Sequence, residues 1–322
     1  MANIWEDLSH DYIFSAIEKA CGNKLTGLLI QRNSYINRVY EVEIASRKER
    51  LIAKFYRPGR WTKEQVLEEH SFLKELAAHE VPVICPVEYE GRTLFTVDKI
   101  NFCVFPKIGG RSVDEFDKEA WQNIGRHLAR IHSCGALRKN SRRIVWRPAI
   151  ATKHHLEVLL SSGLMPEDFK KSMKSIAELF IKKYDPLFNE TAPIVIHGDC
   201  HKGNLISRPG AGIFLIDFDD MCVGPAVQDI WMLLPGKVEE HRQQFDQFLE
   251  GYETFRQFDI DSLDLIPALR GMRLIHYASW LSVQVHDPHF DRHFAETRAP
   301  RYWNELIKEL QAIVYPDSEE IH

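Results

Sequence analysis

Residues 194–220 read IVIHGDCHKGNLISRPGAGIFLIDFDD, and this stretch indicates the fold more strongly than any other. Three apolar residues lead into His197-Gly198-Asp199, and Asn204 lies five residues after Asp199. Between two short apolar runs, Arg208-Pro209-Gly210 has Pro and Gly where a type II turn needs them. The pattern predicts a β-hairpin with Asn204 at the start of one arm and Asp217 at the end of the other.

The open end of this hairpin predicts a metal site. Because a hairpin brings its two ends together, Asn204 and Asp217 are expected to meet there. An amide oxygen and a carboxylate form the oxygen-only site that suits Mg²⁺ shared with substrate phosphates. Asp199, on the preceding loop, is placed to accept a proton from an attacking hydroxyl. A base, two metal ligands and a lysine from elsewhere in the chain form the layout used for phosphoryl transfer.

Two other interpretations of this stretch are weaker. A solvated hairpin could carry two Asp and one Asn as capping residues, but the joint spacing is more specific than that. Gly198-Asp199-Cys200-His201 superficially resembles the metal-binding GDxH of metallophosphoesterases. Those sites need a further Asn-His pair, whereas Leu205 follows Asn204 here.

Composition indicates a water-soluble globular protein. The 322 residues are 44% hydrophobic and 27% charged, and the net charge of −5 argues against nucleic-acid binding. No apolar run approaches the ~18 residues that span a bilayer, and no secretory signal is visible at the start. The six cysteines form no C-x-x-C pair, which is typical of reduced thiols in a cytosol. We therefore expect a cytoplasmic protein that needs no membrane. A monomer is the expected state, although the sequence leaves the oligomeric state open.

The first third of the chain predicts a strand-rich region with one helix. Thr62 can cap that helix, which is expected to run to Glu80, with Gln65 closing a capping box. The strand candidates are 37–44, 50–56, 83–89, 93–98 and 101–105.

The rest of the chain predicts a larger, mainly helical region. Amphipathic helices are expected over 118–133, 165–184 and 238–255. The Pro/Gly-containing stretch 106–110 separates the two regions. We predict an α+β chain with a β-rich lobe over 1–105, a hinge over 106–110 and a helical lobe over 111–322.

The segments HGDCHKGNLI and LIDFDD resemble the catalytic and metal loops of the kinase-like phosphotransferases, the superfamily of aminoglycoside phosphotransferases and choline kinases. The wider sequence, over most of residues 30 to 290, resembles the bacterial stress response kinase A family. The segments that carry this resemblance are NSYINRVYEV, AKFYRPGRWT, LEEHSFL, FPKIGGR, GPAVQDIWML and GMRLIHYASWL. The resemblance implies a bilobal protein-kinase-like fold and transfer of the ATP γ-phosphoryl group to a hydroxyl.

Carried over residue by residue, the resemblance implies roles for the main site residues. Asp199 resembles the catalytic proton acceptor. Asn204 and Asp217 resemble the Mg²⁺ ligands, and Asp217 is also expected to be a catalytic residue. Lys54 resembles the lysine that reaches the nucleotide phosphates, and we expect it to face solvent in the cleft. Glu69 is the expected partner of Lys54, with Glu68 as the alternative.

Other nucleotide contacts follow from the same resemblance. Ser34 lies in Asn33–Asn37, where a phosphate-covering loop should be, although G-x-G-x-x-G is absent and an ordinary turn stays open. Phe105, Lys107 and Ile108 belong to the hinge whose backbone should bind adenine.

Four further residues have less certain roles. Asp229 resembles the acid that anchors the catalytic loop, and Asp219 could add a contact behind the metal. Whether His201 or Lys202 serves the γ-phosphate stays open.

The favoured function is an ATP- and Mg²⁺-dependent protein Ser/Thr kinase, which rests on the resemblance. Whether the protein also phosphorylates itself stays open. One alternative is a small-molecule kinase acting on an aminoglycoside, choline or a sugar-like alcohol. The other is a nucleotide-binding pseudokinase. This alternative is weakened because the four central residues are all present: Lys54, Asp199, Asn204 and Asp217.

Overall fold

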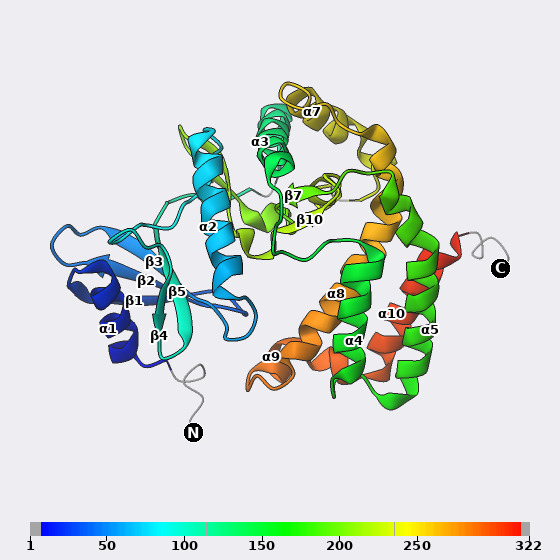
Figure 1. Cartoon of the computed structure of the whole chain (residues 1–322), viewed down its shortest axis with the longest axis horizontal. Helices are drawn as coiled ribbons and strands as arrows, with labels where there is room; N and C mark the ends of the chain where they lie inside the picture. The colour runs from blue at the N-terminus through cyan, green and yellow to red at the C-terminus, as the bar shows by residue number, and fades with distance from the viewer. Residues whose placement is uncertain (1–7, 114, 235, 317–322) are drawn as a thin grey trace.

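The chain folds into a small β-rich lobe and a larger helical lobe, seen in a computed structural model (Figure 1). The structure describes residues 8–113, 115–234 and 236–316. The predicted α+β bilobal fold is confirmed. The outer ends of both predicted lobes, 1–7 and 317–322, lie outside the described residues, and the division at 106–110 stays a prediction.

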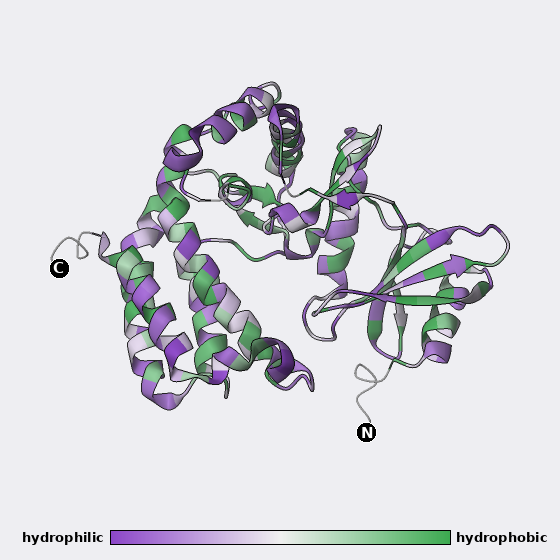
Figure 2. Ribbon diagram, turned by 180° about the vertical axis from the view of Figure 1, so that it is seen from behind, coloured by the Kyte–Doolittle hydropathy of each residue, from purple (hydrophilic) through white to green (hydrophobic). Residues whose placement is uncertain are grey.

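The small lobe is built on an antiparallel five-stranded sheet in the order β1-β2-β3-β5-β4. Its elements are α1 (His10–Cys21), β1 (Leu25–Arg32), β2 (Arg38–Ile44), β3 (Arg50–Phe55), α2 (Lys63–Ala78), β4 (Phe95–Val97) and β5 (Ile100–Pro106). Side chains alternate between the two faces of a strand. On β3, Ala53 and Phe55 therefore face the core that contains α1, whereas Lys54 lies on the opposite face. Hydrophobic and hydrophilic residues follow one another along these strands (Figure 2).

Helix α2 begins as the sequence predicts. The Thr62 hydroxyl accepts a hydrogen bond from the Gln65 backbone N–H at 3.2 Å, and the Gln65 side chain accepts one from the Thr62 N–H at 3.0 Å. This capping box satisfies two N–H groups at the start of the helix. It therefore fixes where the helix that carries Glu68 and Glu69 begins.

Three parts of the small lobe differ from the prediction. Helix α1 and strand β1 were not predicted. The predicted strand 83–89 is wrong, because only Val83 and Tyr89 form isolated bridges there. Val83 bridges in parallel to Leu215, and a proline at Pro86 cannot donate to a sheet ladder.

The large lobe surrounds the predicted hairpin with helices. Its helices of four or more residues in α conformation are α3 (Lys118–Leu137), α4 (Lys153–Ser161), α5 (Glu167–Tyr184), α6 (Gln228–Trp231), α7 (Arg242–Tyr252), α8 (Ile266–Gln284), α9 (Phe290–Phe294) and α10 (Pro300–Val314). Its strands are β6 (Arg111–Ser112), β7 (Ile194–Ile196), β8 (Leu205–Arg208), β9 (Gly212–Leu215) and β10 (Cys222–Gly224). The helices pair as α3 with α7, α4 with α8 and α5 with α10.

Strand β7, which leads into the catalytic loop, lies directly against α3. A Cβ atom at Gly135 of α3 would collide with the backbone carbonyl of Val195 in β7. Glycine is thus required for this close approach. The contact fixes the position from which the His197-Gly198-Asp199 loop departs.

Two general expectations from the sequence can be compared with the structure. All six cysteines are free thiols, as predicted. Within the described ranges, no helix combines the length and apolar character needed to cross a bilayer.

Glu41 of β2 is a fully buried carboxylate surrounded by cations. It forms ion pairs with Arg50 at 2.8 Å, with Lys107 at 3.1 Å and with Arg32. Burial alone would raise the pKa of Glu41, but hydrogen bonds from these cations lower it to about 2. The carboxylate therefore stabilises the folded state wherever it is ionised.

We expect Glu41→Gln to lower the free energy of unfolding by about 1 to 2 kcal/mol near neutral pH, allowing for partial solvent screening. The folded pKa of Glu41 is depressed from 4.5 to about 2, so its contribution is present above the unfolded value and disappears as pH falls through that window. Denaturant unfolding of both proteins at about pH 7 and about pH 3 checks this. An unchanged difference at the two pH values would contradict it, and Glu43→Gln, less buried beside the same Arg50, serves as control.

Candidate active site

The hairpin mouth brings Asn204 and Asp217 together. Leu205 pairs with Leu215 across β8 and β9, and the Ile216 N–H donates to the Asn204 carbonyl at 3.0 Å. The Asn204 amide N–H donates to the Asp199 carbonyl at 2.9 Å. This leaves the amide oxygen of Asn204 with no hydrogen-bond partner among the described residues. The geometry is the predicted one, and the metal-binding role stays a prediction.

Asp217 holds an unfavourable backbone conformation. Its φ is 63° and its ψ 65°, in the left-handed region, which costs a residue other than glycine about 1 to 3 kcal/mol. The side chain is half exposed, and its Oδ1 accepts a hydrogen bond from the Lys54 ammonium at 2.8 Å. Such strain at a polar, accessible residue is typical of functional sites.

Lys54 is buried, and this differs from the prediction of a solvent-facing lysine. Its side chain is 11% exposed, and its Nζ lies 2.8 Å from Asp217 and 2.7 Å from Asp219. Burial alone would lower the pKa of Lys54, but the carboxylates of Asp217 and Asp219 hold it well above the usual value. Lys54 is therefore a fixed positive charge next to the hairpin mouth.

Asp219 is the residue that sequence reasoning undervalued. Its side chain is 4% exposed, and its second oxygen accepts a hydrogen bond from Asn37 at 2.7 Å. Arg143 donates to its backbone carbonyl at 2.6 Å. Asp219 thus joins β3, the phosphate-loop candidate and the large lobe. The sequence signal was its place in the run DFDD, two residues after Asp217.

Glu69 and Glu68 lie on different sides of α2. Glu69 is buried, and its carboxylate pairs with Arg143 at 3.4 Å. Burial and the nearby Asp219 carboxylate raise the pKa of Glu69. Glu68 instead accepts hydrogen bonds from the Ser141 hydroxyl and the Arg142 N–H, at 2.5 and 2.9 Å. The carboxylates in contact with Lys54 are those of Asp217 and Asp219, so the predicted pairing with Glu69 stays a prediction.

Asp199 lies after β7, next to the guanidinium of Arg273 and the ring of His201. Its Oδ1 is 2.6 Å from Arg273 of α8, and its Oδ2 is 3.5 Å from the His201 ring. Burial would raise the pKa of Asp199, but His201 and Arg273 bring it well below its usual range. The carboxylate is therefore ionised and can accept a hydrogen bond from a substrate hydroxyl. Arg273 belongs to the segment GMRLIHYASWL, for which no role was predicted.

His197 connects the two loops of the site. Its Nε2 is 3.0 Å from the Ile216 carbonyl, and its Nδ1 is 3.3 Å from the Asp199 N–H. These partners require a neutral ring that donates through Nε2 and accepts at Nδ1. The ring thereby holds the Asp199 loop against Ile216, which follows strand β9 and precedes Asp217.

Asp229 of α6 anchors the catalytic loop by binding its backbone. Its two oxygens accept the backbone N–H groups of His197 at 2.8 Å and Gly198 at 2.7 Å. His132 of α3 lies 3.1 Å from the same carboxylate, which is fully buried. Gly198 has a φ of 84°, which favours glycine. This arrangement agrees with the structural role expected for Asp229.

The phosphate-loop candidate, residues 33–37, packs against the large lobe. Ser34 Oγ accepts a hydrogen bond from the Asn37 N–H at 3.3 Å, so the hydroxyl helps close the turn. The Tyr35 ring lies 5.0 Å from Phe294 and 5.7 Å from Trp280, which belong to the large lobe. A phosphate contact from Ser34 stays a prediction.

Part of the predicted hinge is already engaged in the small lobe. The Lys107 N–H donates to the Arg50 carbonyl at 3.0 Å, and the Lys107 side chain pairs with Glu41. Phe105 lies in β5 opposite Ile52 of β3, in the same antiparallel ladder. Adenine contacts from the backbone of Phe105, Lys107 and Ile108 therefore stay predictions.

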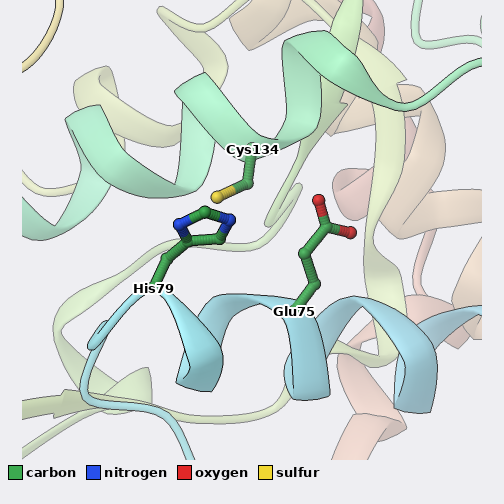
Figure 3. A group of neighbouring side chains, drawn as sticks. All are labelled: Glu75, His79 and Cys134. Carbon is green, nitrogen blue, oxygen red and sulfur yellow. The ribbon is translucent and has the colours of Figure 1, made fainter.

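The oxygen atoms at the hairpin mouth are suitable ligands for a hard divalent cation. The free amide oxygen of Asn204 and the half-exposed carboxylate of Asp217 are oxygen ligands of the kind that Mg²⁺ takes. Elsewhere in the described part of the chain, Glu75, His79 and Cys134 come within 4.8 Å of one another between α2 and α3 (Figure 3). Glu75 there is already paired with Arg138 at 2.6 Å. The group takes no part in the site described above.

Comparison with known proteins decides the family. The model of a phosphotransferase enzyme family matches residues 29–266. This chain belongs to that family. Stress response kinase A of Escherichia coli K12 is 36% identical over 304 residues, which cover 93% of this chain and 90% of the relative. The serine/threonine protein kinase RdoA of Salmonella typhimurium is 36% identical over 84% of this chain and 82% of its own. The resemblance to the stress response kinase A family is confirmed.

Solved structures of other proteins confirm the predicted kinase-like fold. The amicoumacin kinase hAmiN, in complex with AMP-PNP, Ca²⁺ and Ami, superposes with a TM-score of 0.76 at 18% identity, covering 96% of this chain and 94% of its own. A microcompartment-associated aminopropanol kinase gives 0.69 at 17% identity, covering 98% and 99%. At these identities the likeness concerns the fold, and the phosphate acceptor has to be argued from the site.

We expect Lys54→Ala to weaken the use of ATP and to lower the melting temperature. Without the ammonium, the buried Asp219 carboxylate loses a hydrogen bond and its nearest cation, which costs about 1 to 3 kcal/mol. Turnover against ATP concentration, measured with the melting temperature, checks both effects. Lys24→Ala, at a side chain 84% exposed, is the control. Unchanged turnover at every ATP level would remove Lys54 from the site.

Proposed function

We propose that this phosphotransferase is an ATP- and Mg²⁺-dependent protein Ser/Thr kinase. The observation that carries the proposal is the joint placement of Asp199, Asn204 and Asp217, with Lys54 paired to Asp217. An ionised base, two oxygen ligands and a fixed cation are the parts that phosphoryl transfer needs. The relatives named stress response kinase A and serine/threonine protein kinase support a protein as acceptor.

Each residue has a defined part in the proposed reaction. Lys54 neutralises phosphate charge as a buried cation. Asn204 and Asp217 would hold Mg²⁺, which would offset the charge on the transferring phosphoryl group. Asp199 orients the acceptor hydroxyl and accepts its proton. The hydroxyl oxygen bonds to the γ-phosphorus as the bond to the β,γ-bridging oxygen breaks, which leaves ADP. His197 holds Asp199 in a fixed position relative to Asp217.

The charges around Asp199 oppose cationic acceptors. Arg273 and His201 are the charged or ionisable side chains that contact its carboxylate in the described structure. An aminoglycoside or choline would bring positive charge toward a guanidinium, with like-charge repulsion as the result. The small-molecule alternative is therefore less favoured, and the pseudokinase alternative conflicts with a complete set of site residues.

The proposal is tested by offering γ-labelled ATP and Mg²⁺ to the protein with different acceptors. The panel contains the protein alone, one acidic and one basic generic protein, an aminoglycoside and choline. We expect label on Ser or Thr of a protein, including any autophosphorylation, and transfer at least about 100-fold slower with Asp199→Ala. Transfer to a small alcohol and to no protein would overturn the protein-kinase proposal, and nucleotide binding without any transfer would favour a pseudokinase.

A further inference from the structure

A cavity of about 320 Å³ lies beside the catalytic loop. Gly198, directly before Asp199, forms one wall, and Arg273 and His276 of α8 form another. Arg60 and Trp61, which precede α2 in the small lobe, also line it. The cavity therefore opens next to the base and lies between the two lobes.

Two arginines, Arg60 and Arg273, and one carboxylate, Asp220, line this cavity, and each already has an ion-pair partner. Arg60 donates to both oxygens of Asp220, at 2.6 and 2.9 Å, so the carboxylate of Asp220 is already engaged. Arg273 pairs with Asp199 through one nitrogen, and its side chain is 32% exposed. A guanidinium has five N–H donors in a planar fork. Arg273 can therefore contact a second acceptor in the cavity while it holds Asp199.

The remaining wall supplies polar groups without partners. Trp146 is 6% exposed, and its indole N–H has no hydrogen-bond partner in the described part of the chain. The indole N–H of Trp61 and the Nδ1 of His155 are also buried and unpartnered among those residues. Burial lowers the pKa of His155 to about 3 and that of His276 to about 4, so both rings are neutral near pH 7. Buried polar groups are normally satisfied, and an oxygen-rich ligand would satisfy the two indole N–H donors of Trp61 and Trp146.

We propose that this cavity binds a carboxylate of the phosphate acceptor, and that Arg273 is the residue that selects it. The inference rests on the proposed function and deepens it: the favoured acceptor is a Ser or Thr hydroxyl next to an acidic residue. Arg273 contacts the acidic group and Asp199 together, which aligns the hydroxyl with the base. An arginine suits this role because its fork matches a carboxylate.

Two peptides that differ only in the residue after the target Ser, Asp in one and Lys in the other, test the proposal. We expect wild-type kcat/KM to favour the Asp peptide at least about tenfold, the effect of one well-placed charge pair. Arg273→Gln should bring the ratio close to one, and Arg273→Lys should retain part of the preference. The ratio cancels any loss of turnover common to both peptides. Arg270→Gln, exposed one turn earlier on α8, should leave the preference unchanged.

Three results would overturn the inference: equal use of both peptides, a preference for Lys, or an Asp preference that survives in Arg273→Gln. Calorimetry with the same peptides carrying Ala for Ser tests the cavity without turnover, and the same order of affinities is expected. If no protein or peptide is phosphorylated but small alcohols are, the protein-kinase proposal fails separately. Glycolate against ethanolamine as acceptors then tests the cavity, and a preference for ethanolamine would contradict it.

Discussion

Asp199→Ala should lower turnover by ~10²–10⁴-fold while binding of Mg·ATP stays nearly unchanged, because a positioned base contributes that much to proton transfer. The carboxylate lies on the proposed acceptor side of the site, and its contacts are Arg273 and His201. It makes no contact with Lys54 in the described structure. Its loss therefore removes the group that orients the hydroxyl and leaves the proposed nucleotide contacts in place.

Asp217→Ala should weaken nucleotide binding, unlike Asp199→Ala, which should mainly lower turnover. Asp217 is the charged member of the proposed metal pair and also holds Lys54 at 2.8 Å, so nucleotide bound through Mg²⁺ should weaken. Asn204→Ala should resemble it more weakly, since a neutral amide contributes less to a dication than a carboxylate does. It should also loosen the Asp199 loop, because the Asn204 amide holds the Asp199 carbonyl.

Calorimetric titration of Mg·ATP into the three variants, together with turnover, separates the roles. Excess Mg²⁺ should partly restore Asp217→Ala and leave Asp199→Ala unchanged. If Asp199→Ala loses nucleotide affinity while Asp217→Ala keeps both affinity and activity, the assignment of base and metal ligand is wrong.

Asp229→Asn should destabilise the fold by about 3 kcal/mol or more and abolish most activity, although the side chain keeps its shape. Both Asp229 oxygens accept backbone N–H groups, and the residue is fully buried. An asparagine replaces one acceptor with an NH₂ donor, which leaves a buried backbone N–H facing another donor. The catalytic loop from His197 to Asp199 loses its anchor at the same time.

Denaturant unfolding and turnover of Asp229→Asn measure the two effects. Asp117→Asn is the matched control, because Asp117 accepts the Ala120 N–H at an exposed helix start, where asparagine caps as well as aspartate. A stability loss no greater than that of the control would show that Asp229 does not anchor the loop.

The sequence by itself determined the elements whose cause is local. The hairpin follows from two short apolar runs around Pro209-Gly210, and its register places Asn204 opposite the end of β9. The start of α2 follows from the Thr62 and Gln65 capping box. These features depend on residues within a few positions of one another, so spacing predicts them.

Only the tertiary structure decided which distant charges meet. Lys54 and Asp219 are 165 residues apart, and the way β3 lies over the turn after β9 makes them partners. The same holds for Arg273, which reaches Asp199 because α8 passes beside the catalytic loop. Sequence spacing carries no information on such contacts, because an ion pair needs the right distance and burial, and these are set by the packing of whole elements.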